Sequence, residues 1–96
     1  MKQAWVFMVT NRPNSVLYVG ITNDISRRAW EHREGIGGQF TSKYRLKTLV
    51  YAEHHEIIVE AIRREKQIKH WPRQYKINLN EASNPEWRDL TREFLW

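Results

Sequence analysis

The alternation of apolar and polar side chains predicts three strands in the first half of the chain. Residues 4–10 form an apolar, aromatic run with β-branched members, and a second apolar run covers 16–22. The segment between them, 11–15, has the composition of a turn, so the two runs predict a β-hairpin with a five-residue connection. A third apolar run over 46–53 predicts one more strand.

Capping residues and helix breakers predict helices elsewhere. Asp24 is a good N-cap, and Gly35 supplies the break that ends the first helix. Asn84 and Pro85 have the pattern of an N-cap followed by proline at the first helical position. The predicted helices cover residues 24–34, 55–71, 74–82 and 84–94. Together these elements predict one α/β (α+β) domain over residues 1–96, with a small three-stranded antiparallel sheet flanked by helices.

The second predicted strand has two different faces. Leu17, Val19 and Ile21 share one face, which we assign to the core. Tyr18 projects from the opposite face, and Gly20 beside it leaves room for a backbone or a ligand to approach. Tyr18 is therefore either an ordinary strand tyrosine with its hydroxyl in water or part of a functional site.

The first predicted helix carries an arginine and a histidine on one side. Arg28 and His32 are four residues apart, so they lie one turn from each other on the same face. This face is either a solvated surface with charged neighbours or one wall of a site. A phenol, a guanidinium and an imidazole are groups that can cut a phosphodiester bond when a metal-binding carboxylate is also present.

A carboxylate interrupts the apolar stripe of the longest predicted helix. In projection Glu65 falls inside an arc that we expect to face the core and that comprises Ile57, Ile58, Ala61, Ile62 and Ile68. A carboxylate on such a stripe needs a cationic partner. Lys69 offers a local ion pair at i+4, and a divalent metal at the edge of the sheet is the alternative. A single carboxylate with water ligands suits Mg²⁺, with Mn²⁺ as its substitute.

Composition narrows the function further. The chain has 96 residues, a formal net charge of +5 and no cysteine. The lack of cysteine excludes disulfides, thiolate zinc sites and cysteine nucleophiles, and it agrees with a reducing cytoplasm. No apolar run approaches the roughly 20 residues that span a bilayer, and the first ten residues lack the features of a secretory signal. The basic charge indicates a polyanionic partner, nucleic acid first, with ordinary solvated charge as the alternative.

Several motifs resemble those of the GIY-YIG nuclease superfamily, most closely its small stand-alone bacterial members. Residues 18–20, Tyr-Val-Gly, match the second signature tripeptide. Residues 6–8, Val-Phe-Met, stand in the place of the first tripeptide at the family's usual spacing. The first-helix signature and later blocks of the small members match residues 24–35, 40–44, 61–69 and 84–87.

This resemblance implies a fold and roles for individual residues. The family fold is a three-stranded antiparallel sheet flanked by helices, in agreement with the pattern above. The resemblance implies that Tyr18 helps to deprotonate the attacking water, that Arg28 contacts the scissile phosphate and that His32 assists proton transfer. It also implies that Glu65 is the sole protein ligand of a divalent metal, normally Mg²⁺. The basic residues that we expect to hold nucleic-acid phosphates are Arg27, Lys43, Arg63, Lys66 and Lys69.

The chain departs from the family pattern at the first tripeptide. Phe7 replaces the usual tyrosine, so a hydroxyl that helps to orient the site is lost. An asparagine used by some members near the metal has three candidates here, Asn78, Asn80 and Asn84. Phe7 is thus a catalytic-site position whose effect on activity the sequence leaves open.

Three functions are compatible with these residues. The leading hypothesis is a metal-dependent endonuclease that hydrolyses phosphodiester bonds in DNA, with a preference for DNA structure rather than for a long sequence. The first alternative is a nucleic-acid-binding module whose catalysis is weakened or lost through Phe7. The second is a protein that dimerises through its aromatic residues, including those at 94–96. The sequence does not separate DNA from RNA, DNA repair from mobile-element defence, or a monomer from a weak homodimer.

Overall fold

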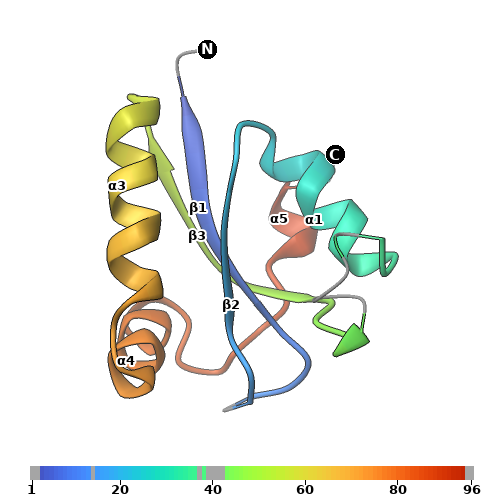
Figure 1. The fold of residues 1–96 in the computed structure, drawn as a ribbon. Helices are drawn as coiled ribbons and strands as arrows, with labels where there is room; N and C mark the ends of the chain where they lie inside the picture. The colour runs from blue at the N-terminus through green and yellow to red at the C-terminus, as the bar shows by residue number, and fades with distance from the viewer. Residues whose placement is uncertain (1–2, 14, 37, 39–42, 95–96) are drawn as a thin grey trace.

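A three-stranded antiparallel sheet forms the centre of the computed structural model, which describes residues 3–13, 15–36, 38 and 43–94 (Figure 1). The strands are β1 (Ala4–Thr10), β2 (Tyr18–Thr22) and β3 (Thr48–His55). Their order is β2-β1-β3, so β1 is central and β2 is an edge strand. The predicted sheet is confirmed, although β2 and β3 each begin two residues later than the sequence pattern suggested. The predicted motif block at 40–44 lies partly outside the described residues, because 40–42 are not among them.

Helices cover both faces of the sheet (Figure 1). They are α1 (Ile25–Arg33), α3 (Ile58–Lys69), α4 (Arg73–Ser83) and the short α5 (Thr91–Phe94). Helices α3 and α4 lie on one side, and α1 and α5 lie on the other. Asp24 caps α1 as predicted, because its Oδ1 accepts a hydrogen bond from the backbone N–H of Arg27 at 3.1 Å.

The predicted core face of β2 packs under α3 and α4. Val19 belongs to a buried cluster with Met8 of β1 and with Ala61 and Ile68 of α3, and Leu17 and Ile21 pack against this cluster. The face assignment made from alternation is therefore confirmed. The burial of these apolar side chains is the main force that holds α3 to the sheet.

The opposite face, which carries Tyr18, is a second core rather than an open surface. Phe7 and Val9 of β1 are buried there against Ile25 and Ala29 of α1, and Tyr18 packs against the same cluster. Phe94 of α5 also packs here, with its ring 5.3 Å from that of Trp5. Phe94 therefore closes the core, whereas Leu95 and Trp96 lie outside the described residues.

The last predicted helix was wrong over most of its length. Asn84 ends α4 instead of starting a new helix, and the chain becomes helical again only at Thr91. The buried Asn84 side chain donates to the carbonyl oxygen of Val50 at 2.9 Å and accepts from the backbone N–H of Arg88 at 3.0 Å. This side chain cross-links a non-helical turn to β3, an arrangement that depends on a residue 34 positions away.

The apolar stripe of α3 was also partly mispredicted. Ala61, Glu65 and Ile68 are the buried residues of α3, whereas Ile57 and Ile62 are 53% and 41% exposed. Helix α3 contacts all three strands, but only one side of its apolar arc is buried against them. A row of aliphatic side chains consequently remains at the surface.

One close approach fixes the contact between β1 and β2. Phe7 and Gly20 are register partners, and the Phe7 ring lies directly against the Gly20 backbone. A Cβ atom at position 20 would lie 2.5 Å from Cζ of Phe7 and 3.0 Å from both Cε atoms. Glycine is thus required here by the packing of one ring, since non-bonded carbon atoms normally stay about 3.5–4.0 Å apart.

We expect Gly20→Ala to lower the free energy of unfolding by about 1–3 kcal/mol, because the added methyl overpacks the ring. Urea unfolding followed by circular dichroism measures the change. The same substitution in a Phe7→Leu background, which lacks Cζ, should cost less than half as much. An equal cost in both backgrounds would show that the ring contact is not the cause.

Candidate active site

Three aromatic rings from three elements meet beside the edge strand. Phe7 comes from β1, Tyr18 from β2 and His32 from α1. The His32 ring centroid lies 5.5 Å from that of Phe7 and 6.4 Å from that of Tyr18. The structure therefore brings together the predicted residues of the two tripeptides and the first helix.

His32 is the most perturbed group at this position. Its side chain is 1% exposed, and neither ring nitrogen has a hydrogen-bond partner among the described residues. Burial, and next the positive charge of Arg28, lower its pKa from 6.5 to about 4. At neutral pH the imidazole is therefore uncharged and can accept a proton. Sequence spacing placed His32 beside Arg28 but gave no indication that it would be this deeply buried.

Arg28 is only partly buried and points its charge towards the open side of the site. Its Nη1 lies 3.0 Å from Oε1 of Glu31, and its side chain is 32% exposed. Arg27 is more exposed and lies 4.0 Å from the same Glu31 carboxylate. One carboxylate is thus shared by two guanidinium groups, which leaves positive charge available to an anionic ligand.

Glu65 of α3 is connected to Tyr18 through the side chain of Lys69. It is 8% exposed, and its Oε2 lies 2.5 Å from Nζ of Lys69. That hydrogen bond raises the pKa of Lys69. The same Nζ lies 6.0 Å from the centre of the Tyr18 ring, so Tyr18, Lys69 and Glu65 form a continuous set at the edge of the sheet. The ion pair weighed from the sequence is present in the structure.

The donor set fits a single hydrated divalent ion. Within the described ranges no group of three or more His, Cys, Asp or Glu side chains could hold a metal. Glu65 is one buried carboxylate at the edge of the site, and Mg²⁺ characteristically binds through one or two carboxylates, several waters and substrate phosphates. Lys69 occupies one carboxylate oxygen, so metal binding there requires this ammonium to move away or to share the carboxylate.

The three candidate asparagines differ sharply in their surroundings. Asn78 is exposed and accepts a hydrogen bond from Gln74, and Asn84 is satisfied by backbone groups. Asn80 is fully buried, and neither end of its amide has a partner among the described residues. An unpaired buried amide is costly, so Asn80 is the asparagine that the fold leaves available for a polar contact. Asn80 comes three residues after Ile77, so both lie on the buried face of α4. This spacing is the sequence signal that identifies Asn80 as a buried residue.

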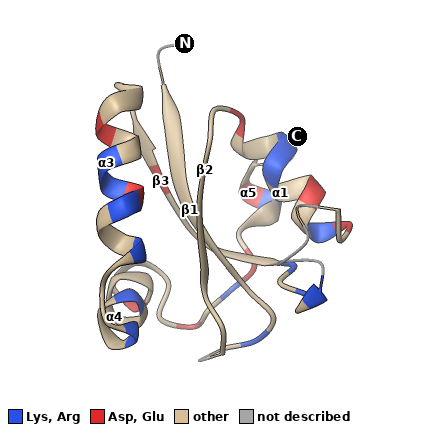
Figure 2. Ribbon diagram, in the orientation of Figure 1, with Lys and Arg blue, Asp and Glu red and all other residues tan. Residues whose placement is uncertain are grey.

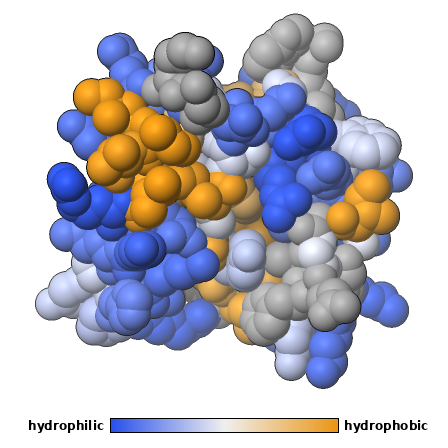
Figure 3. Space-filling model, turned by 45° about the horizontal axis from the view of Figure 1, so that its top comes forward, coloured by the Kyte–Doolittle hydropathy of each residue, from blue (hydrophilic) through white to orange (hydrophobic). Residues whose placement is uncertain are grey.

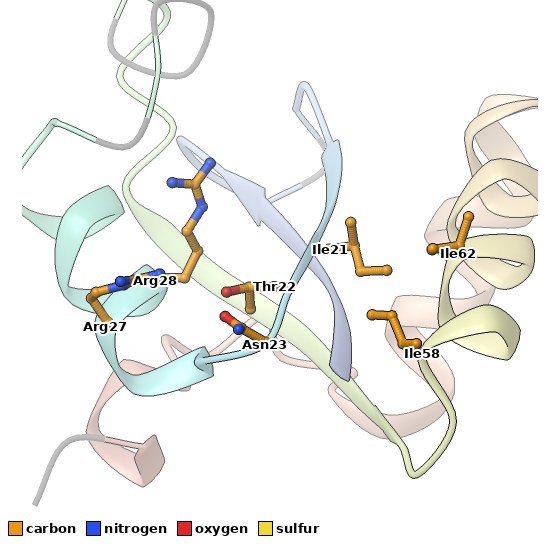
Figure 4. Close-up of a pocket in the computed structure, with 7 residues that line it drawn as sticks. All are labelled: Ile21, Thr22, Asn23, Arg27, Arg28, Ile58 and Ile62. Atoms are coloured by element: carbon orange, nitrogen blue, oxygen red, sulfur yellow. The ribbon is translucent and has the colours of Figure 1, made fainter. Parts of the chain in front are cut away.

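An open cleft of about 440 Å³ lies across the end of β2, between α1 and α3 (Figure 4). Arg27 and Arg28 line it on one side of the strand, and Ile58 and Ile62 line it on the other. The strand end contributes Ile21, Thr22 and Asn23. Sequence analysis missed this cleft, because its apolar residues were assigned to the core.

The predicted phosphate-binding residues do not form one patch. Arg27 lines the cleft, and Lys69 is paired with Glu65. Arg63 and Lys66 are exposed on α3, where Figure 2 shows basic and acidic positions interspersed. Lys43 is exposed near Tyr44, with its Nζ 5.5 Å from that ring.

The fold and these residues agree with comparisons to known proteins. Residues 3–78 match the GIY-YIG catalytic domain, and the chain belongs to this family. Membership implies a nuclease-type function and a nucleic-acid substrate. In the part of the chain that the structure describes, every helix is too short or too polar to cross a membrane.

The relatives that the chain matches are small bacterial proteins. A UPF0213 protein of Staphylococcus haemolyticus is 37% identical over 81 residues, which cover 84% of this chain and 98% of the relative. A UPF0213 protein of Staphylococcus aureus strain N315 is 37% identical over 79 residues, covering 82% and 95%. The NMR structure of a UPF0213 protein from Bacillus halodurans has a TM-score of 0.55 at 23% identity and covers 98% of this chain and 99% of that one. That similarity supports the fold.

The buried His32 predicts a pH-dependent stability. The unfolded chain takes up a proton as pH falls below 6.5, whereas the folded chain does so only near pH 4. The unfolded state therefore binds more protons between these values, and stability present above pH 6.5 is lost on acidification. We expect a loss of about 2–3 kcal/mol between pH 7 and pH 4 from this residue, at about 1.4 kcal/mol per pKa unit.

Urea unfolding of the wild type and of His32→Gln at several pH values isolates this effect. The other histidines are common to both chains, so the difference between the two pH profiles belongs to His32. Parallel profiles would mean that His32 titrates normally in the folded protein.

Proposed function

We propose that this protein is a Mg²⁺-dependent endonuclease, also active with Mn²⁺, that hydrolyses phosphodiester bonds in DNA. The observation that carries the proposal is the meeting of Tyr18, Arg28, His32 and Glu65 around one edge strand of a nuclease-family fold. The reaction adds water to phosphorus and breaks a P–O bond, so it needs a proton acceptor for the water and positive charge for the phosphate.

Tyr18 is the proposed group that takes the proton from water. A free phenol has a pKa near 10, so it acts as a base only beside positive charge. Lys69 supplies such a charge 6.0 Å from the centre of the Tyr18 ring. Arg28 belongs to α1, the helix that packs against the same face of the sheet as Tyr18. The His32 imidazole is the proposed partner in passing this proton on: it is uncharged at neutral pH, so one ring nitrogen can accept a hydrogen bond while the other donates one.

Arg28 is the proposed contact to the scissile phosphate. Arg28 lines the cleft, and its guanidinium, which pairs with Glu31, remains partly exposed. A fixed guanidinium that faces the phosphate stabilises the charge that develops on the phosphate oxygens in the transition state. Arg27, Arg63, Lys66 and Lys43 would contact neighbouring phosphates, which strengthens binding without reading the sequence.

Glu65 is the proposed metal ligand, with water and phosphate oxygens completing the shell. A divalent ion held there supplies Lewis-acid stabilisation of the phosphate and of the leaving oxygen. Lys69 balances the Glu65 charge in the structure, and its ammonium would have to move away or share the carboxylate for an ion to bind there. Because the relatives are bacterial and the proposed substrate is DNA, we propose that the protein acts in the cytoplasm. We propose that it acts there as a monomer or a weak homodimer.

We expect Tyr18→Phe, Arg28→Ala and Glu65→Gln each to reduce DNA cleavage by roughly 100-fold or more, as loss of a general base or an electrostatic stabiliser does. The measurement is cleavage of labelled single-stranded, duplex, flap and branched DNA with Mg²⁺ or Mn²⁺ against EDTA. Binding to the same DNA is followed in parallel.

The chain offers a matched control for each variant. Tyr75, Arg33 and Glu60 are exposed residues of the same types, so Tyr75→Phe, Arg33→Ala and Glu60→Gln should leave cleavage unchanged. Cleavage that persists in EDTA or in Glu65→Gln contradicts the metal role. Binding without cleavage of any substrate by the wild type would favour the alternative function, a nucleic-acid-binding module without catalysis.

Phe7 is the specific observation that favours the nucleic-acid-binding module. Its ring contacts His32, whose nitrogens have no partner among the described residues, and a tyrosine at this position would add a hydroxyl at Cζ. We expect Phe7→Tyr to raise the cleavage rate by roughly 2- to 10-fold, since one hydrogen bond contributes about 0.5–1.5 kcal/mol. Single-turnover rates measure the change, with Phe94→Tyr as a control in the same core. An unchanged or lower rate would show that the missing hydroxyl is not a defect in this chain.

A further inference from the structure

The cleft across the end of β2 has two walls of unlike chemistry. Arg27 and Arg28 form a cationic wall on α1, and Ile58 and Ile62 form an aliphatic wall on α3 (Figure 4). We propose that this cleft binds a nucleotide whose base is out of the helical stack, so that the protein selects DNA with an unpaired nucleotide beside the cut. The position of this nucleotide beside the cut rests on the proposed endonuclease function. Binding of an unstacked nucleotide in the cleft does not depend on that function.

The cationic wall suits a phosphate next to the one being cut. Arg28, the proposed contact to the scissile phosphate, belongs to this wall, so the cleft adjoins the reacting position. The Arg27 side chain is 62% exposed, and its Nε lies 4.0 Å from Oε2 of Glu31, beyond hydrogen-bonding distance and at the limit of an ion pair. A phosphate bound here can therefore contact a guanidinium that its neighbouring carboxylate does not fully neutralise.

The aliphatic wall does not suit a phosphate. Ile58 and Ile62 are four residues apart on α3 and face Ile21 at the strand end, as Figure 4 shows. Ile62 is 41% exposed, so its side chain presents apolar surface to the cleft. Continuous duplex DNA presents charged backbones to such a wall, since its base faces are stacked and hidden. An unstacked base presents an apolar face, and covering it removes apolar surface from water on both partners.

The dimensions and the charge agree with a nucleotide as the occupant. A volume of about 440 Å³ falls in the range of about 300–1,000 Å³ that is usual for small-ligand sites. Asn23 lies between the two walls, where its amide can meet a polar base edge, whereas the neighbouring Thr22 hydroxyl is bonded to the Asp24 backbone. A nucleotide has a negative group and an apolar face, and the cleft offers a partner for each.

A second copy of the chain is the competing occupant. Ile57 and Val59 continue the exposed aliphatic surface beyond the cleft, and Figure 3 shows these hydrophobic side chains gathered over the start of α3. Each copy carries a net charge of +5, however, so two copies repel each other while a polyanion is attracted. The charge therefore favours nucleic acid over self-association.

The test measures binding of the wild-type protein in EDTA, where metal-dependent cutting is off. The probes are a duplex with one bulged 2-aminopurine and the same duplex with that base paired, because 2-aminopurine brightens when it leaves the stack. We expect at least tenfold tighter binding to the bulged duplex and a rise in fluorescence on binding. Ile62→Gln should reduce the preference to threefold or less.

Val59→Gln is the matched control, since Val59 is 58% exposed on the same helix and does not line the cleft. It should keep the full preference, whereas Arg27→Ala should weaken binding to both duplexes. Equal binding of both duplexes overturns the inference, as does an Ile62→Gln variant that keeps the preference. A dimer in sedimentation that Ile62→Gln dissociates would assign the wall to self-association instead.

Cleavage with Mg²⁺ separates the two proposals. Preference for the bulged duplex without cleavage would overturn the endonuclease and leave the nucleotide cleft standing. Equal cleavage of paired and bulged duplexes, with equal binding, would overturn the cleft and leave the endonuclease standing.

Discussion

The contact between the Phe7 ring and the backbone of Gly20 is the constraint on which the site depends. It joins the central strand to the edge strand at a position where even one methyl group does not fit. The Phe7 ring also lies against His32 of α1, so the same ring helps to set how closely α1 approaches β2. Tyr18, two residues from Gly20 and on the same face of the strand, is thereby held beside the imidazole.

The edge position of β2 explains why residues from opposite faces of the sheet can act together. Helix α1 covers the Phe7 face and α3 covers the Val19 face, and the sheet separates them everywhere except at its rim. At the β2 edge, Lys69 of α3 reaches over the ring of Tyr18, while α1 supplies Arg28. The proposed catalytic set is therefore assembled around a rim rather than inside a pocket on one face.

Charge at this rim is arranged in small, partly satisfied sets. Glu31 is shared by two arginines, and the buried Glu65 is balanced by one lysine. Each set pairs its charges in the structure, yet each contains a cationic group that an anionic ligand can contact. His32, which lies near Tyr18 and Arg28, is uncharged at neutral pH, because burial and the neighbouring guanidinium lower its pKa.

The sequence by itself determined the strands, the principal helices, the Asp24 cap and the opposite faces of Val19 and Tyr18. These follow from periodicity and from bonds between residues a few positions apart, which a local pattern encodes. Only the tertiary structure decided that Ile62 is exposed, that the Asn84 side chain links a turn to Val50, and that His32 is buried with no hydrogen-bond partner among the described residues. Each of these depends on how far the sheet extends beneath a helix or on a contact between segments distant in the chain, and such distances are fixed only when the layers pack.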